Sequence, residues 1–292
     1  MDGLLVIRKD KDCTSRDVVN SVSKILGIKK VGHTGTLDPI ATGVLVLCLG
    51  KCTKLVDIIT SDEKEYIAGV CLGIETDTLD VTGNIIKYDN NYVTKEDIKN
   101  VLNNMIGYYD QEVPIYSAVK INGKKLYEYA RENKDVVLPK RKVNIKKLEL
   151  VSDIIYDDNK VYFQIKCLVS KGTYIRSLIR DIAYNLRTVG VMTSLCRTKQ
   201  GKFNIEDSYT IDDIKNGDFK LINMRTYFND LYTVMVDNNM KKDILNGKVI
   251  DNIYDCDKIL FIDETDLVLA IYTIYDKDNN KIKPYKMFGG IN

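Results

Sequence analysis

A glycine-rich loop that runs into an apolar segment constrains the fold of this chain more than any other feature. Residues 32–39 have the sequence GHTGTLDP, and the apolar run Val44 to Leu49 follows a third glycine, Gly43. Glycine reaches backbone angles that other residues reach only at a cost, and Pro39 biases Asp38 towards an extended conformation. The sequence therefore predicts a stiff turn that presents the Asp38 carboxylate at the edge of buried structure. Asp38 is a candidate catalytic acid; the alternative is that it only closes a turn, as Asp before Pro often does.

The bulk composition indicates a globular protein with one large and one small domain. The chain has 292 residues, of which 45% are hydrophobic and 29% are charged, and both values are ordinary for such proteins. No apolar run reaches the roughly 18 residues of a membrane-spanning helix. The start of the chain, MDGLLVIRKDKD, mixes acids and bases, which argues against a secretory signal. We therefore expect a cytoplasmic protein.

Metal and disulfide chemistry find little support in the sequence. The seven cysteines are odd in number, scattered and never spaced C-x-x-C, and His33 is the single histidine. Several cysteines lie in apolar runs, where a reduced thiol packs as a small hydrophobic side chain. We expect reduced core cysteines and no metal site.

The net charge of +2 hides a strongly basic segment. Residues 120–202 carry 19 basic and 8 acidic side chains, whereas residues 61–119 carry 4 and 11 and residues 203–292 carry 11 and 16. A basic face of this kind suits a partner that carries phosphates. The alternative is a solvated surface that the acidic segments balance, and charge alone does not decide between the two.

The hydrophobic pattern predicts a chain of mixed strands and helices. The first predicted helix begins at Thr14 or Ser15 and ends at Gly27, and the cap Thr94 begins the next long one. Strands are expected at 4–8, 44–49, 65–73, 143–151, 160–170, 190–203, 259–262, 268–275 and 283–288, with a turn at 156–159, and further helices at 53–60, 94–106 and 175–186.

Arg176 stands out on electrostatic grounds. It falls in the first turn of the helix predicted after Gly172, where the helix dipole disfavours a cation. We therefore expect an anion close to its guanidinium.

Residues 114–142 interrupt the regular pattern. Asn122-Gly123 indicates a turn, and the stretch from Lys124 to Arg131, KKLYEYAR, interleaves bases with tyrosines. Cations that follow phosphates and aromatic rings that support bases are typical of single-stranded RNA binding. An amphipathic surface helix is the alternative.

Five motifs, in order, resemble the signature segments of one enzyme family. They are GHTGTLDPIATGVLVLCLGKCTK from Gly32, a K-x-Y strand from Lys64, a T-D-T-x-D turn from Thr76, PIYSAVK from Pro114 and KGTYIR from Lys171. Residues 190–203 also resemble the family's L-x-R-T-x-x-G-x-F strand, so that the likeness covers roughly residues 1–205. The family is TruB, whose members convert uridine 55 of tRNA to pseudouridine.

The resemblance implies a fold and a domain organisation. We expect an α+β (mixed α/β) pseudouridine synthase domain over residues 1–232, built on a mainly antiparallel mixed sheet flanked by helices. The basic segment at about residues 114–142 resembles an insertion that folds over the tRNA arm. Residues 233–292 are acidic and strand-rich, and weakly resemble the small PUA-like RNA-binding domain that ends many family members.

The resemblance also implies roles for particular side chains. Asp38 would be the catalytic carboxylate, either as nucleophile at C1′ of the ribose or as base at C2′. Arg176 would pair with Asp38 and keep it ionised in a site that excludes water. Tyr66 would stack on the uracil and help to remove the proton from C5. The side chains expected to contact the substrate are His33, Tyr66, Tyr174, Leu195, Lys120 and Lys124, and His33 would fill the space that the flipped nucleotide leaves.

The implied reaction consumes nothing and uses no cofactor or metal. The bond from the ribose to N1 of uracil breaks, the base turns, and the sugar rejoins at C5. The target uridine must first be flipped out of its stack, at a cost on the order of a few kcal/mol, of which stacking on an aromatic side chain returns about 1 to 3 kcal/mol. The expected partner is the T-arm stem-loop of tRNA, and we expect a monomer that needs no membrane.

Two positions bear on how closely the chain follows the family. Cys196 stands where many relatives carry Arg, which puts one RNA contact in doubt. Thr36 stands at a position that is often Arg in other pseudouridine synthase families, so it favours TruB over them.

Two other functions compete with this interpretation. A non-catalytic RNA-binding or tRNA-folding protein would account for the basic segment, but not for Asp38 together with Arg176. A nucleoside or glycoside hydrolase would need Asp77 or Asp80 as a second carboxylate beside Asp38.

Overall fold

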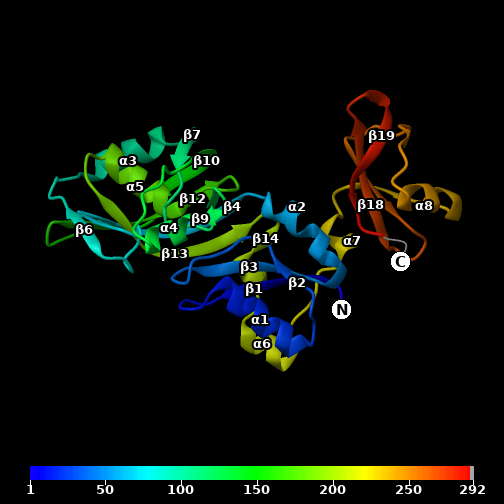
Figure 1. Cartoon of the computed structure of the whole chain (residues 1–292), viewed down its shortest axis with the longest axis horizontal. Helices are drawn as coiled ribbons and strands as arrows, with labels where there is room; N and C mark the ends of the chain where they lie inside the picture. The colour runs from blue at the N-terminus through cyan, green and yellow to red at the C-terminus, as the bar shows by residue number, and fades with distance from the viewer. Residues whose placement is uncertain (290–292) are drawn as a thin grey trace.

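A large mixed sheet with helices on its faces, followed by a smaller sheet, makes up the computed structural model, which describes residues 1–289 (Figure 1). The strands of the large sheet are β1 (Gly3–Lys9), β2 (Val31–His33), β3 (Thr42–Leu49), β4 (Lys64–Leu72), β7 (Gly107–Glu112), β10 (Lys140–Leu150), β11 (Ile155–Asp157), β12 (Lys160–Val169), β13 (Gly190–Gln200) and β14 (Phe203–Asn204). They are arranged in the order β1-β3-β13-β4-β12-β10-β7, with β2, β11 and β14 paired beside this path. Every pair is antiparallel except β3 with β13. The mainly antiparallel mixed sheet expected from the sequence is confirmed.

Helices cover the two halves of this sheet separately. Helices α1 (Ser15–Leu26) and α6 (Ile211–Asn216) pack against β1 and β3, and helices α3 (Lys95–Asn104) and α5 (Ile175–Asn185) pack against β4, β10 and β12 (Figure 1). Each half therefore has its own hydrophobic core.

Strand β3 is buried on both faces, which explains its continuous apolar sequence. Leu45, Leu47 and Leu49 belong to the core under α1, whereas Val44 and Val46 belong to a second core on the opposite face. Successive side chains of a strand point to opposite faces. A strand with two buried faces therefore has no polar positions, as the sequence from 44 to 49 predicted.

The predicted helix starts are confirmed. Thr14 caps α1 and Thr94 caps α3, and in each case the Asp three residues later completes a capping box. Gly27 ends α1 with a positive φ of 66°, a conformation that glycine adopts without steric cost.

Two local expectations were wrong in detail. The helix expected at 53–60 is a 3₁₀ turn, η1 (Gly50–Leu55), followed by the short helix α2 (Val56–Thr60). The turn expected at 156–159 is shorter, because β11 pairs with β12 and leaves only Asp158 and Asn159 between them. Both have positive φ, 45° and 61°, which Asp and Asn tolerate and a two-residue hairpin turn requires.

Most of the segment 114–142 forms small elements outside the large sheet, whereas its last residues, 140–142, begin β10. Strands β8 (Lys120–Ile121) and β9 (Lys124–Lys125) pair around Asn122-Gly123, as the turn signal predicted, and the helix α4 (Leu126–Arg131) follows. The hairpin of β5 (Ile74–Thr76) and β6 (Ile85–Tyr88) is a second small sheet.

The C-terminal part forms a separate five-stranded sheet in the order β15-β17-β18-β19-β16. Its strands are β15 (Tyr232–Met235), β16 (Ile250–Asp251), β17 (Lys258–Ile262), β18 (Val268–Tyr275) and β19 (Asp278–Met287), and the helix α8 (Asn238–Leu245) packs against β18 (Figure 1). The three longest strands confirm the expected ones, whereas β15, β16 and α8 were not predicted. Leu260 and Phe288 share a core with Leu4 of the large sheet and with α7 (Met224–Tyr227), so an apolar contact joins the two parts. A domain boundary at residue 232 stays a prediction.

None of the helices between residues 1 and 289 combines the length and the apolar character that crossing a bilayer requires.

Candidate active site

Two buried polar side chains hold the loop that carries Asp38. The Ser15 hydroxyl accepts a hydrogen bond from the Leu37 N–H (2.9 Å) and donates to the Leu37 carbonyl (3.3 Å). The Lys9 ammonium donates to the carbonyls of Ala41 (2.7 Å) and Pro39 (3.4 Å). Asp38 is therefore fixed from both sides, and the stiff turn predicted from the sequence is confirmed.

The two halves of the large sheet meet at a narrow point next to this loop. Strands β3 and β13 pair only through Thr42 with Cys196 and Gly43 with Arg197. A Cβ on Gly43 would lie 2.2 Å from the Arg197 carbonyl oxygen, so only glycine fits there. The Arg197 guanidinium, in a residue that is 1% exposed, donates to the carbonyls of Val44 (2.6 Å) and Gly35 (3.1 Å). Arg197 thus ties the Asp38 loop to the sheet.

Asp38 and Arg176 form a two-point ion pair. The Arg176 Nη2 donates to the Asp38 Oδ1 at 3.2 Å, and Nε lies 3.0 Å from Oδ2. The second contact is electrostatic, because its geometry is too bent for a hydrogen bond. The anion expected near Arg176 is present, so that part of the prediction is confirmed.

Backbone carbonyls and a second carboxylate complete the surroundings of Arg176. Its Nη1 donates to the Thr78 carbonyl and its Nη2 to the Tyr116 carbonyl, both at 3.0 Å. The Asp80 Oδ2 lies 3.8 Å from Nη1. The guanidinium is held in one orientation, which fixes the direction in which Asp38 points.

A cavity of about 910 Å³ opens over this ion pair. Its wall contains five of the eight predicted site residues, namely Asp38, Tyr66, Tyr174, Arg176 and Leu195. They come from the loop before β3, from β4, from the N-terminus of α5 and from β13. Residues that are 157 positions apart in the printed sequence, Asp38 and Leu195, therefore share one site.

Tyr66 is neutral in the free protein. Its residue is 8% exposed, and burial raises the pKa of its phenol, whereas the neighbouring Arg197 guanidinium opposes this shift. Arg197 stands directly opposite Tyr66 on the adjacent strand. The tyrosine is thus available as a stacking platform, and its phenolate gains stability from a nearby cation.

His33 lies outside the cavity wall, at the end of β2. Burial, together with the nearby cations Arg16 and Arg197, lowers the pKa of its imidazole. The Gly35 N–H donates to its Nδ1 at 3.4 Å. A ring that stays neutral suits the predicted wedge better than a proton carrier, and the RNA contact stays a prediction.

Lys120 and Lys124 also lie outside the cavity wall, in the small β8–β9 hairpin. Lys124 forms an ion pair of 2.5 Å with Glu132, and its ammonium lies 5.0 Å from the centre of the Tyr129 ring. Lys124 and Lys134 together lower the pKa of Glu132 to about 2. Part of the charge of Lys124 is therefore already compensated, and contacts of Lys120 and Lys124 with RNA stay predictions.

Sequence reasoning missed several cations of the cavity wall. These are Lys64, Arg141, Lys142, Lys171 and Arg197. Among residues 1–289 none of the five forms an ion pair with a carboxylate. Burial and neighbouring cations lower the pKa of Lys64 to about 8. A row of uncompensated cations around a cavity favours a polyanionic ligand. The basic composition of residues 120–202 was the signal for four of them, and Lys64 lies outside that segment.

Ser117 was missed as well, although it lies in the PIYSAVK motif. It lines the cavity, is 7% exposed, and its hydroxyl has no hydrogen-bond partner among the described residues. A buried hydroxyl without a partner is unusual and calls for an explanation.

The carboxylates that a hydrolase would need are not placed for that role. Neither Asp77 nor Asp80 lines the cavity. Asp80 is 5% exposed, and its Oδ1 accepts hydrogen bonds from Thr78 and from the backbone and side chain of Thr82. Asp77 accepts from the backbone of Asn84 in the same turn. Both acids stabilise the loop between β5 and β6.

No metal site is visible in the part of the chain that the structure describes, since residues 1–289 contain no group of three or more His, Cys, Asp or Glu side chains that could hold an ion. The seven cysteines are free thiols, and four of them, Cys48, Cys52, Cys71 and Cys167, are buried.

The sequence is similar to a family profile and to curated proteins. The profile of the N-terminal domain of TruB family pseudouridylate synthases matches residues 23–175. Two curated relatives from Staphylococcus aureus, strains JH9 and Newman, are each called tRNA pseudouridine synthase B. Both are 40% identical to this chain over 302 residues, which covers 98% of this chain and 99% of theirs.

Solved structures share the fold. A Cbf5-Nop10-Gar1 complex matches with a TM-score of 0.69 at 24% identity, over 99% of this chain and 85% of that one. An H/ACA RNP bound to a substrate RNA containing 2′-deoxyuridine matches with a TM-score of 0.67 at 22% identity, over 98% and 85%.

Proposed function

The chain belongs to the TruB family of pseudouridylate synthases, and we propose on this premise that it isomerises uridine 55 in the T-arm loop of tRNA to pseudouridine, with Asp38 as the catalytic carboxylate. The activity is that of an isomerase, in line with the relatives called tRNA pseudouridine synthase B. The target position and the residue roles are the finer part of the proposal.

The observation that carries the proposal is the pair of Asp38 and Arg176 at the wall of a cavity large enough for a nucleotide. Asp38 is 37% exposed in its side chain and Arg176 is 8% exposed, so the carboxylate can reach a ligand while the guanidinium stays behind it. The guanidinium places an opposite charge against the carboxylate and fixes its orientation. An ionised acid at a ribose is what either nucleophilic attack at C1′ or proton abstraction at C2′ requires.

The aromatic residues of the cavity suit an extruded base. Tyr66 and Tyr174 both line it, and stacking of a base on an aromatic ring contributes about 1 to 3 kcal/mol. This offsets much of the cost of flipping the base, which is on the order of a few kcal/mol. Once the glycosidic bond breaks, enclosure of the uracil lets it turn and rejoin at C5 before it escapes.

The cations of the wall suit the phosphates of the RNA strand. Lys64, Arg141, Lys142 and Lys171 surround the cavity, and contacts of this kind hold the backbone without reading its sequence. The T-arm stem-loop supplies a short strand whose target uridine is flipped out of its stack. We place the reaction in the cytoplasm and assign it to a single chain.

Release of tritium from C5 tests this proposal. A T-arm hairpin labelled at C5 of its uridine loses the label only when C5 becomes bonded to C1′. We expect release without any added cofactor or metal, at one tritium per modified uridine. Binding of the hairpin without release would support the non-catalytic RNA-binding alternative instead.

The same assay separates the hydrolase alternative. A hydrolase would produce free uracil and an abasic site, and the label would stay on the base. Chromatography of the products therefore distinguishes all three activities in a single experiment.

A further inference from the structure

A buried glutamine outside the cavity holds the helix that carries Arg176. We propose that Gln111, on β7, is a positioning residue for the reaction, because it fixes the N-terminus of α5 and, through it, Tyr174 and Arg176. The inference rests on the proposed function, since it assigns Gln111 a part in the same reaction.

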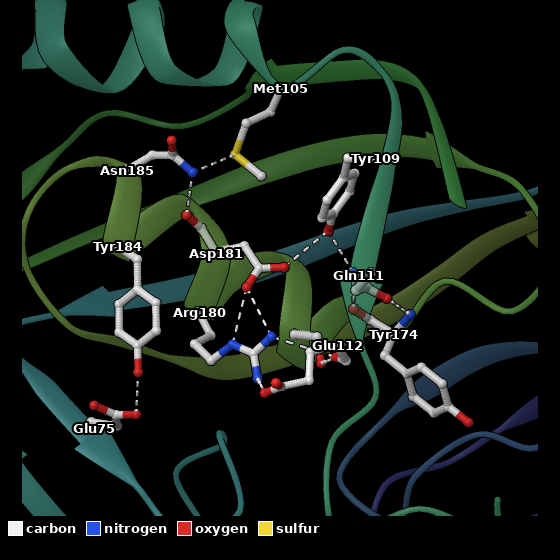
Figure 2. A network of polar contacts seen from close by, with 11 residues as sticks. Glu75, Met105, Tyr109, Gln111, Glu112, Tyr174, Arg180, Asp181, Tyr184 and Asn185 are labelled. Carbon is white, nitrogen blue, oxygen red and sulfur yellow. Dashed lines mark hydrogen bonds and ion pairs between the residues drawn. The ribbon is translucent and has the colours of Figure 1, made fainter. Parts of the chain in front are cut away.

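Helix α5 has no cap of its own. Its N-cap residue is Tyr174, whose side chain makes no capping hydrogen bond. The Gln111 amide instead holds the backbone of the N-cap residue, because its Oε1 accepts from the Tyr174 N–H at 2.8 Å and its Nε2 donates to the Tyr174 carbonyl at 3.1 Å (Figure 2). Gln111 is 1% exposed, so solvent cannot easily replace these bonds.

The orientation of the Gln111 amide is fixed by a further bond. The second proton of Nε2 goes to the Tyr109 hydroxyl at 2.7 Å, and this hydroxyl donates to the Asp181 Oδ2 at 3.2 Å. Burial raises the pKa of both Tyr109 and Asp181. Asp181 lies on α5, so the chain of bonds that begins at Tyr174 returns to the same helix. A flipped amide would face the Tyr174 N–H with its own N–H groups, and only the observed orientation satisfies all the partners.

The residue after Gln111 holds the next turn of α5. The Glu112 carbonyl accepts from the Ser177 hydroxyl at 2.8 Å, and its carboxylate accepts from Arg180 at 3.0 Å. Four residues later, the Tyr116 carbonyl accepts from Arg176. The end of β7 and the loop after it therefore bind α5 through three residues, Gln111, Glu112 and Tyr116. Gln111 makes the contact at the start of the helix.

The bonds between Gln111 and Tyr174 lie next to the cavity. In Figure 2 the ring of Tyr174 points away from Gln111, while its backbone meets the amide. Tyr174 lines the cavity, and Arg176 follows two residues later in the first turn. If the Tyr174 backbone is released, the first turn of α5 loosens, and the Arg176 guanidinium moves relative to Asp38. A misplacement of about 1 Å can lower a rate by about 100-fold.

The effect should fall on chemistry and leave RNA binding intact. The uncompensated cations of the cavity wall, apart from Arg197, lie on β4, on β10 and in the loop before α5. Arg141 pairs with Gln111 through the backbone of β10 and β7, but the Gln111 side-chain amide bonds only Tyr109 and Tyr174 and none of these cations. We therefore expect the rate of the bound complex to fall while the affinity for RNA stays the same.

The test compares Gln111→Met with a matched control, Tyr109→Phe. Methionine has a similar volume but no amide, so it leaves the Tyr174 N–H without a partner, while the Tyr174 carbonyl keeps only its bond from the Leu178 N–H (2.9 Å). Tyr109→Phe removes one buried hydroxyl from the same network and keeps both bonds between Gln111 and Tyr174. The measurements are the melting temperature, the dissociation constant for the T-arm hairpin, and the single-turnover rate of tritium release at a temperature where both variants are folded.

We expect both variants to melt at lower temperature. Gln111→Met should react at least about tenfold more slowly with its dissociation constant within about twofold of the unchanged protein. Tyr109→Phe should react within about twofold of the unchanged rate. An unchanged rate for Gln111→Met, or equal loss in both variants, would show that Gln111 only stabilises the fold. If Gln111→Met fails to fold, Gln111→Glu replaces it. Glutamate keeps an acceptor for the Tyr174 N–H but offers no donor to the Tyr174 carbonyl, and its rate is compared with that of Tyr109→Phe in the same way.

A second readout does not depend on activity. Amide hydrogen exchange from Ile175 to Ile179 should be faster in Gln111→Met than in Tyr109→Phe, because only the first variant frees the start of α5. Equal exchange in both would overturn the inference by itself. Lack of tritium release by the unchanged protein would instead refute the proposed function, and the exchange measurement would still decide the role of Gln111.

Discussion

At the scale of single residues, the division of burial between Asp38 and Arg176 decides what the pair can do. The carboxylate is half exposed, and the guanidinium is nearly fully buried and bonded to the carbonyls of Thr78 and Tyr116. The acid can approach a substrate without leaving an unpaired cation in the protein, because these carbonyls and Asp80 remain beside Arg176. A pair buried on both sides would keep the carboxylate away from a substrate.

Ser117→Ala should separate stability from activity. The Ser117 hydroxyl has no partner among the described residues, and burying such a group costs roughly 1 to 3 kcal/mol. Its removal should leave the free energy of unfolding unchanged or raise it. If the hydroxyl bonds the flipped nucleotide, kcat/KM should fall roughly three- to tenfold, the value of one neutral hydrogen bond. Chemical denaturation measures the free energy of unfolding, and initial rates give kcat/KM. An unchanged kcat/KM would exclude a contact with the substrate.

The pH dependence of turnover should reveal whether Tyr66 accepts the C5 proton. Burial raises the pKa of its phenol, so the phenolate fraction at neutral pH is small and grows about tenfold per pH unit below that pKa. The rate of the bound complex should therefore rise between pH 7 and about pH 9. Tyr66→Phe should retain some activity through stacking, with no such rise, and Tyr66→Leu should lose more. A flat profile for the unchanged protein would leave Tyr66 a stacking role alone.

The candidate reaction centre was predictable where a motif named the residue, and not where only the fold assembles the site. Asp38, Tyr66 and Arg176 were each marked by a short motif, and the position of Arg176 in its helix predicted its anion. Arg197 lies in the L-x-R-T-x-x-G-x-F segment, from which its role was not read, and Gln111 lies in no motif. Their importance comes from burial and from bonds to segments far along the chain, which no local pattern contains.

At the scale of elements, the junction of β3 and β13 is the most constrained point of the large sheet. Gly43→Ala would place a Cβ 2.2 Å from the Arg197 carbonyl oxygen, at a φ of 101°. Gly217→Ala is the matched control, because φ is also positive, at 80°, but nothing lies within 4 Å. The control should lose about 1 to 2 kcal/mol of stability from backbone strain alone.

The loss in Gly43→Ala should exceed that of the control by at least about 2 kcal/mol, because β3 and β13 must move apart. Urea denaturation measures both values. Equal losses would mean that the two strands adjust without cost, and the Asp38 loop would then be less rigid than we infer.

Helices and strands with a cap or a clear apolar pattern in their own sequence were predicted. Short strands that form only by pairing with a neighbouring strand were not. The apolar faces of α1 and α3, their caps Thr14 and Thr94, and the fully apolar β3 were all readable from the sequence. The tight turn between β11 and β12 was misplaced, because a strand of three residues has no periodicity to detect. In the C-terminal part, β15 and β16 exist only through pairing with β17 and β19.

At the scale of the whole molecule, the distribution of charge should govern affinity for RNA. The cavity wall carries uncompensated cations, whereas residues 203–292 carry 11 basic and 16 acidic side chains. Binding of the T-arm hairpin should therefore weaken with salt, and Arg141→Ala or Lys142→Ala should each reduce the slope of log K against log salt by about 1.

Lys281→Ala is the control for this prediction. Lys281 is exposed on the C-terminal sheet and pairs with Asp251 at 3.0 Å. The slope for this variant should equal that of the unchanged protein. If it falls as much as in Arg141→Ala, the C-terminal sheet also contacts the RNA backbone.

The most direct test of the account is Asp38→Asn, assayed by tritium release and by binding of the same hairpin. The amide keeps the shape of the side chain and removes its charge and its reactivity. We predict that release stops while the dissociation constant stays within a few fold, because Asp38 acts on the sugar and the cations of the wall hold the RNA. Substantial residual release by the variant would contradict the assignment of Asp38 as the catalytic carboxylate.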